Sequence, residues 1–277
     1  MLADQSVRAV LDAFASADPT PGGGSAAALA GALGASLLAM VAGMPKTKTG
    51  TPEDRAALDA ARARLLSLRD ELVQLIDRDA DAYDLVVAAY RRPKATEADK
   101  AARASAIQEA LRVATAVPLE TYKACTEAME AAGTVAARAN PSAVSDVVVG
   151  FSSLGLGLQG AALNVEINLG SITDAAWVES IAQELRGRAK NLHEAARQVY
   201  STEPVLDLMK KAAQRAGTGH GTPPYEAGTP EFRNAAARAA VGALARLDVA
   251  EAHQALERLA ASDDPGVSQP ARDALNR

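Results

Sequence analysis

The sequence predicts an all-α protein: a helical bundle with two central helices of small residues, followed by a short HEAT-like helical extension. Aromatic residues make up only 3% of the 277 residues, and alternating runs of β-branched residues, which are typical of strands, are almost absent. Segments 25–44 and 147–165 contain no charged residue and are rich in alanine and glycine. Because side chains this small let helix axes approach closely, we expect the two segments to pack against each other.

The first expected helix covers residues 3–17 and ends at Asp18-Pro19. Its apolar side chains share one face: Val7, Val10, Leu11 and Phe14. A tight turn, Pro-Thr-Pro-Gly-Gly-Gly, follows at 19–24 and opens the first small-residue helix, with Ser25 as its expected N-cap.

The glycine turn has two interpretations. The free N–H groups of Gly22, Gly23, Gly24 and Ser25, at the positive end of a helix dipole, suit an anion or a carbonyl oxygen. The turn would equally serve only to start a core helix. It has neither the GxxxxGK[ST] spacing of a P-loop nor the GxGxxG spacing of a dinucleotide site, so no nucleotide is expected there.

Composition argues against several classes of protein. The formal net charge is −5 and no basic run is interleaved with aromatics, so a nucleic-acid partner is not expected. Cys125 has no second cysteine to pair with, which fits a reducing cytoplasm. The three histidines, His193, His220 and His253, lack metal-ligand spacing, so no metal is expected.

Segment 22–45 is uncharged and long enough to raise a membrane span. Alanine and glycine contribute little to insertion, and the preceding segment carries aspartates rather than a basic flank. We therefore expect a buried core helix, no membrane partner, and a cytoplasmic protein.

A short basic loop follows Pro45, which ends this helix. Lys46 and Lys48 are ordinary solvated surface charges or a contact for the anionic tail of a ligand. Thr51 and Pro52 then start the next helix, as N-cap and first-turn proline.

The helix from 53 to 90 contains the most informative residue. At 100° per residue, its apolar side chains form one stripe: Leu65, Leu68, Leu72, Leu75, Ile76, Val86 and Tyr90. Asp77, Asp81 and Asp84 fall on the opposite, solvent face, whereas Asp79 falls within the stripe. Burial of a carboxylate is costly and raises its pKa, so Asp79 is either a paired structural acid or a catalytic group.

Tyr83 lies one turn after Asp79 on the same face, where it would fill the core or stack on a ligand ring. The following helix starts at Thr96. Pro118 should kink that helix or divide it from 119–132, and Gly133 should interrupt it.

Segment 140–168 carries the remaining polar candidates. Asn140-Pro141-Ser142 predicts a helix N-terminus with Ser142 as cap, and Ser145 and Asp146 would bond free N–H groups. Asn164 and Asn168 stand four apart on one face, where they would cap the helix end or bind the edge of a heterocycle. A further helix is expected over 174–200.

The segments PTPGGGSAAALAGALGASLLAMVAGM, DRDADAY, IQEALRVATAVP, NPSAVSD and ALNVEINL occur in the order found in the cyclodeaminase/cyclohydrolase family of one-carbon folate metabolism, which the chain resembles over 5–205. The resemblance implies an all-helical homodimer that binds folate near the subunit interface without a metal or redox cofactor. Its catalytic aspartate corresponds to Asp79. Its other site positions correspond to Gly22, Gly23, Gly24, Ser25, Ser145, Asp146, Asn164 and Asn168. The chain departs from the family at 46–50, where many members have a basic run with an aromatic.

The resemblance implies hydrolysis of 5,10-methenyltetrahydrofolate to 10-formyltetrahydrofolate, because the motifs are most similar to those of stand-alone members. The first alternative is formimidoyltetrahydrofolate cyclodeaminase, which releases ammonia. The second is a non-catalytic dimeric scaffold of helices.

Residues 206–277 lie outside the resemblance. Segment 206–228 is a linker by composition. Segment 229–277 repeats a pattern at a spacing of roughly 35 residues, which is typical of HEAT-like helical units. Two such units are too few to be stable alone, so this extension is expected to pack on the core or on a protein partner.

Overall fold

The computed structural model describes residues 1–208, 257, 260–261, 272 and 275. The chain divides into two compact units, Met1–Thr202 and Glu203–Arg277. The expected linker over 206–228 lies outside the described residues except for 206–208. The expected HEAT-like extension over 229–277 lies outside them except for 257, 260–261, 272 and 275.

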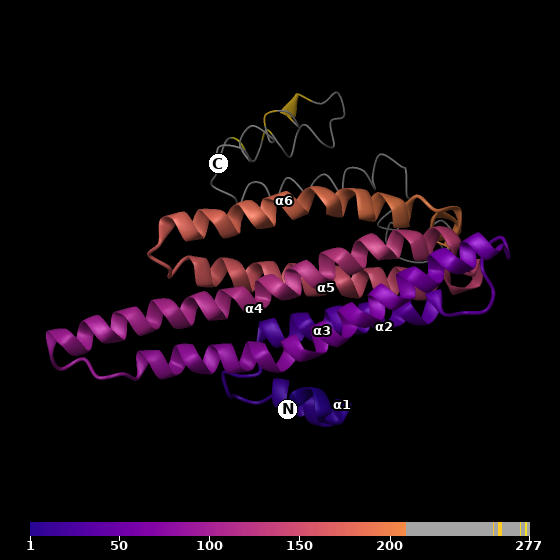
Figure 1. Ribbon diagram of the computed structural model, residues 1–277. Helices are drawn as coiled ribbons and strands as arrows, with labels where there is room; N and C mark the ends of the chain where they lie inside the picture. The colour runs from indigo at the N-terminus through magenta and orange to yellow at the C-terminus, as the bar shows by residue number, and fades with distance from the viewer. Residues whose placement is uncertain (209–256, 258–259, 262–271, 273–274, 276–277) are drawn as a thin grey trace, which may run out of the picture. The chain divides into compact units, whose positions relative to one another are not determined.

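The first unit is built from helices, which confirms the all-α prediction (Figure 1). No strand occurs within residues 1–208. The elements in chain order are η1 (Leu2–Asp4), α1 (Val7–Phe14), α2 (Gly23–Ala42), α3 (Pro52–Tyr90), α4 (Glu97–Arg138), η2 (Pro141–Ala143), α5 (Val144–Leu169) and α6 (Ala175–Tyr200).

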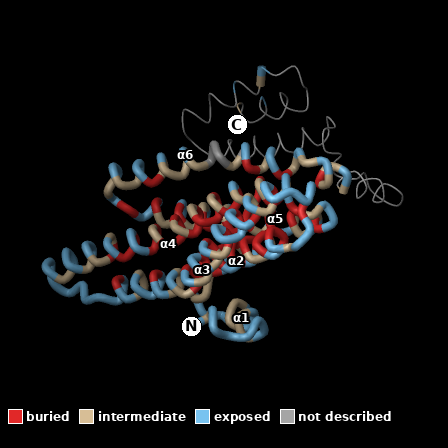
Figure 2. The backbone as a smooth tube through the Cα atoms, turned by 45° about the vertical axis from the view of Figure 1, so that its right-hand side comes forward, coloured by how far each residue is buried: buried red, intermediate tan, exposed pale blue. Residues whose placement is uncertain are grey.

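Helices α2, α3, α4 and α5 form an antiparallel four-helix bundle, in which each helix packs on the one before it and α5 closes the ring against α2. Helix α6 packs along α4 in the parallel direction, as the Arg112–Asp174 and Lys123–Glu184 ion pairs show. Figure 2 shows the buried positions gathered where the four bundle helices meet. Figures 1 and 2 also show the tip of the α3–α4 hairpin extending beyond α2 and α5.

Glycines let α2 and α5 approach backbone to backbone, as the small-residue segments predict. A Cβ atom at Gly34 would lie 2.6 Å from the carbonyl oxygen of Gly150, and one at Gly157 would lie 2.7 Å from that of Ala27. Both distances are too short for any side chain, so alanine at either position would push the helices apart. The outer face of α5, in contrast, is exposed.

The N-terminal prediction was partly wrong. Segment 3–17 is not one helix: η1 is separate, and α1 begins after Ser6, whose side chain accepts a hydrogen bond from the Ala9 N–H. Val7 and Leu11 are exposed rather than packed. Figure 1 shows α1 lying apart from the four-helix bundle.

Pro118 and Gly133 do not interrupt α4, which runs unbroken from Glu97 to Arg138. A proline lacks the N–H that would bond the carbonyl four residues earlier, here that of Ala114. The side chain of Asn168 donates to this carbonyl instead, over 2.7 Å.

Tyr90 was expected in the apolar stripe of α3 but is exposed, because it lies at the end of α3 near the hairpin tip.

The basic loop after α2 is held at the far end of the bundle. Lys48 N–H donates to the carbonyl of Arg138, and the Asp54 carboxylate accepts from the Thr49 hydroxyl at 2.6 Å and from Arg138 at 2.9 Å. Hydrogen bonds from Thr49, and then from Arg138, lower the pKa of Asp54 against the opposing effect of burial. Lys46 and Lys48 themselves are exposed.

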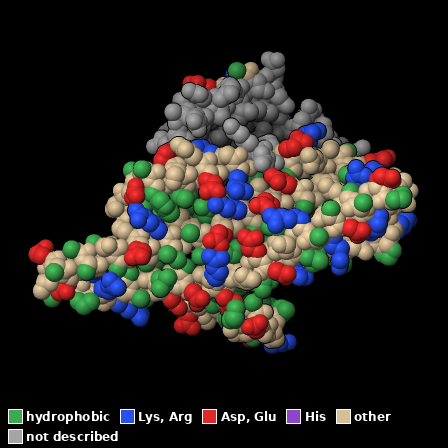
Figure 3. Space-filling view, viewed as in Figure 1, with side chains coloured by type: hydrophobic (Ala, Val, Ile, Leu, Met, Phe, Trp, Pro, Cys, Tyr) green, Lys and Arg blue, Asp and Glu red, His purple; other side chains and the backbone are tan. Residues whose placement is uncertain are grey.

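By length and composition alone, Gly23–Ala42 and Pro141–Leu169 are both apolar enough to cross a membrane. Core helices of water-soluble bundles meet the same criterion, and α2 packs inside this bundle. The face in Figure 3 carries acidic and basic side chains interspersed, with no segregated basic patch on that face.

Candidate active site

The carboxyl group of Asp79 lies against the first turn of α2. The Ser25 hydroxyl is 3.1 Å from Oδ2 of Asp79, and a Cβ atom at Gly24 would lie 2.5 Å from its Cγ. Burial raises the pKa of Asp79, and hydrogen bonds from the Ser25 side chain and backbone N–H partly oppose this rise. Asp79, which the sequence pattern placed in the apolar stripe of α3, is therefore a half-buried acid beside the N-terminus of α2.

The expectation that Ser25 is the N-cap of α2 was wrong. Gly22 takes that position, with extended backbone angles (φ −116°, ψ −159°), and Ser25 is the third residue of the helix. Its side chain is 0% exposed, and its hydroxyl lies 2.9 Å from the carbonyl oxygen of Ile76. Because α2 begins with helical glycines, Ser25 is turned inward to α3 instead of closing the helix end.

Asn164 approaches the same turn from α5. A Cβ atom at Gly23 would lie 3.4 Å from its Nδ2, which donates to the Gly160 carbonyl at 2.8 Å. Within the described part of the chain, Oδ1 of Asn164 accepts no hydrogen bond. Helices α2, α3 and α5 therefore bring Gly23, Gly24, Asp79 and Asn164 together at one end of the bundle.

Asn168 does not cap the helix end, because its amide nitrogen donates to the carbonyl that Pro118 leaves without a partner. This structural role of Asn168 was not predicted from the sequence. Pro118 within a helical pattern indicates that the Ala114 carbonyl lacks its helix partner. It does not indicate which side chain donates to that carbonyl.

Tyr83 does not fill the core, since its side chain is 44% exposed one turn beyond Asp79.

Asp77 is only half-exposed, although the sequence pattern placed it on the solvent face of α3. It accepts hydrogen bonds from the N–H groups of Leu2 and Ala3, at 2.5 and 3.4 Å, and so anchors the N-terminal segment two residues from Asp79. No sequence pattern pointed to this contact.

The remaining candidates lie at the opposite end of α2. Ser145 is exposed and Asp146 half-buried, both in the first turn of α5. Gly150, one turn further on, contacts Leu38. The rise of an α-helix puts Leu38 about 20 Å from Ser25 along α2. Ser142 is not a cap: its N–H donates to the side chain of Asn140.

Lys46 and Lys48 belong to this second end, because their loop pairs with Arg138 and Ala139 just before α5. One copy of the chain therefore holds two separate groups of candidate residues. The first, which we call the aspartate end, contains Gly22, Gly23, Gly24, Ser25, Asp79, Tyr83 and Asn164. The second, the lysine end, contains Lys46, Lys48, Ser145 and Asp146.

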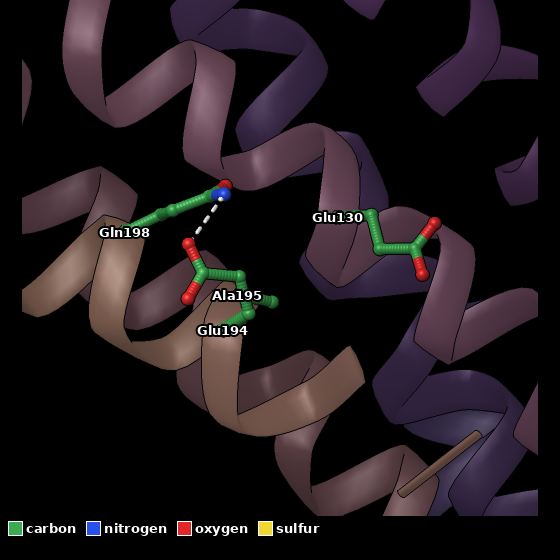
Figure 4. Close-up of a pocket in the computed structure, with 4 residues that line it drawn as sticks. All are labelled: Glu130, Glu194, Ala195 and Gln198. Carbon is green, nitrogen blue, oxygen red and sulfur yellow. Dashed lines mark hydrogen bonds between the residues drawn. The ribbon is translucent and has the colours of Figure 1, made fainter. Parts of the chain in front are cut away.

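A pocket also lies between α4 and α6, lined by Glu130, Glu194, Ala195 and Gln198 (Figure 4). Glu194 accepts a hydrogen bond from Gln198 there and pairs with Arg197. None of the candidate residues lines it. Across the described residues, no group of three or more His, Cys, Asp and Glu side chains is arranged to hold a metal ion.

Comparison with known proteins identifies the family. The family model described as formiminotransferase-cyclodeaminase matches residues 6–187. The chain belongs to this family. It is 39% identical to the methenyltetrahydrofolate cyclohydrolase of Methylorubrum extorquens over 202 residues, which are 73% of this chain and 97% of that protein.

Other family members are longer than the matched region. The formimidoyltransferase-cyclodeaminase of Rattus norvegicus is 34% identical over 195 residues, which are 68% of this chain but 36% of that protein. The solved structure of formiminotetrahydrofolate cyclodeaminase from Thermotoga maritima has the same fold, with a TM-score of 0.65 at 23% identity, and the match covers 73% of this chain and 97% of that one.

Proposed function

We propose that this family member hydrolyses 5,10-methenyltetrahydrofolate to 10-formyltetrahydrofolate, with Asp79 as the general base and acid. The observation that carries the proposal is the position of Asp79, whose carboxyl group is half-buried against the first turn of α2 and whose pKa is raised by burial. The similarity of this chain to a cyclohydrolase, which covers 97% of the length of that protein, supports the choice of reaction.

The chemistry requires one group that moves a proton. Water adds to the cationic carbon between N5 and N10, and Asp79 accepts a proton from that water as the C–O bond forms. Protonated Asp79 then donates to N5, the C–N5 bond breaks, and the hydroxyl proton leaves to solvent as the formyl C=O forms. A raised pKa suits both transfers, because it brings the pKa of the carboxyl group closer to neutral pH. The reaction balances with water as the only co-reactant, so we propose no cofactor.

Other side chains at the aspartate end would hold the substrate. Tyr83 is exposed beside Asp79 and offers a ring for stacking, and Oδ1 of Asn164 is free to accept from an N–H of the pterin. The free N–H groups at the start of α2 suit a carbonyl oxygen. Ionised Asp79 would also stabilise the cationic substrate.

We infer that the chain forms a homodimer through the outer face of α2 and α5. Large apolar side chains are exposed along both helices: Leu29, Leu33, Met40, Val149, Leu156, Leu163 and Ile167. Ile167 is 74% exposed, and exposed apolar surface of this extent favours burial against a partner. The face has no charge on α2, so a second copy can cover it without desolvating an ion there.

A two-fold axis perpendicular to α5 would complete the site. Such an axis runs the two copies of α5 in opposite directions, so the lysine end of one copy meets the aspartate end of the other. Lys46, Lys48, Ser145 and Asp146 would then reach the folate held at Asp79 of the partner copy. The two lysines are suited to the anionic glutamate tail of the substrate.

Mixing two inactive variants tests this shared site. Asp79→Asn and Asp146→Ala homodimers should each lack activity. In a mixed dimer, one site carries both substitutions and the other carries none. Random re-association gives half mixed dimers, so the mixture should recover about 25% of wild-type activity. No recovery, with mixed dimers confirmed by mass, would show that each site is built within one copy.

The reaction itself is tested by the loss of 5,10-methenyltetrahydrofolate absorbance with purified protein. Loss faster than in buffer supports cyclohydrolase. No acceleration, together with ammonia release from 5-formimidoyltetrahydrofolate, would instead establish the cyclodeaminase. Neither activity, and no folate binding at millimolar concentration, would favour the dimeric scaffold and a protein partner for 229–277. We also propose a cytoplasmic location, because the single cysteine, Cys125, is a free buried thiol and the sequence has no second cysteine for a disulfide.

A further inference from the structure

The Ser25 hydroxyl lies between two acceptors. It is 2.9 Å from the carbonyl oxygen of Ile76 and 3.1 Å from Oδ2 of Asp79. A hydroxyl has one proton, an amide carbonyl can only accept, and an ionised carboxylate can only accept. Because Ser25 is fully buried, water does not supply a second donor there. With Asp79 ionised, the two acceptors therefore compete for one proton.

Protonation of Asp79 removes the competition. The protonated acid donates to Oγ of Ser25, and the Ser25 hydroxyl is then free to donate to Ile76. Each protonation state of Asp79 thus has its own arrangement of the same three groups. The backbone N–H of Ser25, like its side chain, lowers the pKa of Asp79 and so favours the ionised carboxylate beside it.

We propose that Ser25 is a positioning residue for Asp79. Each time Asp79 loses its proton, the hydroxyl proton of Ser25 turns from the Ile76 carbonyl to the Asp79 carboxylate. The proposal rests on the acid–base role assigned to Asp79. It replaces the expectation that Ser25 contacts substrate, since a fully buried side chain has no surface to offer one. Its function is to hold one carboxyl orientation while a proton arrives and leaves.

Other charged groups near Asp79 are bound or exposed. Arg78 pairs with Glu120 of α4, Asp77 is bound by the N-terminal segment, and Asp81 is exposed. Helix α2 carries no charge. Other titratable groups on the surrounding segments include Asp4, Asp18, Tyr83, Asp84, Tyr122 and Glu166. Burial and Ser25 are the causes of the pKa shift of Asp79, so the pH response tested below is assigned to this pair.

Nuclear magnetic resonance can follow the Ile76 carbonyl directly. Ile76-Asp77 is the one Ile-Asp step in the sequence, so carbonyl-¹³C isoleucine combined with ¹⁵N aspartate marks this carbonyl alone. In the wild-type protein, its carbon resonance should move with pH at the same midpoint as the Asp79 carboxyl carbon. Asp79→Asn, whose amide can donate as the protonated acid does, should hold the resonance near its low-pH position.

Removing the hydroxyl should separate the two titrations. In Ser25→Ala, the Asp79 carboxyl should titrate at a higher pH, and the matching movement of the Ile76 carbonyl should be lost. Ser25→Cys keeps the side-chain shape with a weak donor, and should show a reduced movement if Ser25→Ala does not fold. A wild-type Ile76 resonance that stays still while Asp79 titrates, or an unchanged movement in the folded variant, would overturn the proposal.

Kinetics supply the second readout. Ser25→Ala should lower kcat about tenfold at neutral pH, leave KM within about twofold, and move the limb of the kcat–pH profile that reports Asp79 to higher pH. Ser36→Ala is the matched control, because Ser36 lies on the same helix and donates only to its own Ala32 carbonyl at 2.7 Å. Its profile should be that of wild type. If the protein has no turnover, the proposed reaction fails while the resonance measurement still decides the role of Ser25.

Discussion

Gly24 on α2 lies directly against the carboxyl group of Asp79 on α3, with no room for a side chain between them. A Cβ atom at Gly24 would be 2.5 Å from Cγ and 2.7 Å from Oδ2 of Asp79. Gly24 is buried inside a regular helix, where alanine would otherwise be the better helix former. The glycine is therefore required by the approach of the acid rather than by the backbone conformation.

Gly24→Ala should consequently displace Asp79 and reduce kcat about 100-fold while the protein stays folded, because misplacing a catalytic group by about 1 Å has effects of this size. Circular dichroism and methenyltetrahydrofolate hydrolysis would measure the two properties. Gly187→Ala on α6 is the matched control, since a Cβ atom there meets no atom within 4 Å and Gly187 belongs to neither group of candidate residues. Equal activity in both variants would contradict the importance of the Gly24 contact.

The raised pKa of Asp79 predicts a pH-dependent stability. A carboxyl group with a higher pKa in the folded state binds its proton more tightly there, so its contribution to stability falls as the pH rises from about 4 through the folded-state pKa. Asp79→Asn removes this loss. The unfolding free energy of the variant relative to that of wild type should therefore be higher at pH 7 than at pH 4. Thermal unfolding of both proteins at the two pH values measures it, and an equal difference at both would argue against a raised pKa.

Pro118 and Asn168 should be energetically coupled through the Ala114 carbonyl. Asn168→Ala leaves that buried acceptor without a donor and should cost about 1–3 kcal/mol. Pro118→Ala restores the N–H that can bond Ala114 within α4, so Asn168→Ala should cost less in that background. Chemical unfolding of the two single variants and the double variant measures the coupling. Additive costs would mean that Asn168 does not replace the missing helix bond.

The dimer face predicts a change of assembly. Leu156→Glu and Leu163→Glu each put a charge on a side chain that is more than 60% exposed in the single copy. Either substitution should give a folded monomer with little activity, because the shared site is then incomplete. Light scattering measures the mass. Leu85→Glu, an exposed leucine on α3, is the control and should remain dimeric; dissociation of that variant instead would place the interface elsewhere.

Sequence patterns predicted the helices well, because the information is local. Thr51 is the N-cap expected for α3, and Thr96 caps the helix that was expected to start there. Leu65, Leu68, Leu72 and Leu75 are buried along one face of α3, as expected. The same periodicity placed Asp79 within the apolar stripe. A helical wheel is enough for this, since the angle around one helix determines which side chains face the bundle.

Contacts between helices were less predictable. The single carbonyl that Pro118 leaves free is visible in the sequence, but the partner that rescues it comes from Asn168, 50 positions later. Ser25 was expected at a helix end because serine favours caps, yet α2 starts three residues earlier and turns the side chain toward Ile76. The separation of Asp146 from Asp79 likewise depends on the antiparallel packing of α2 and α5, which no local pattern specifies.

The catalytic role of Asp79 is tested most directly by comparing Asp79→Asn with Asp81→Asn in the hydrolysis of 5,10-methenyltetrahydrofolate. Both aspartates lie on α3, but Asp81 is exposed to solvent while Asp79 contacts α2. A catalytic role for Asp79 predicts that Asp79→Asn lowers kcat by about 10²–10⁴-fold with the fold retained, whereas Asp81→Asn has wild-type activity. Wild-type turnover in Asp79→Asn would contradict the assignment of Asp79 as the catalytic acid and base.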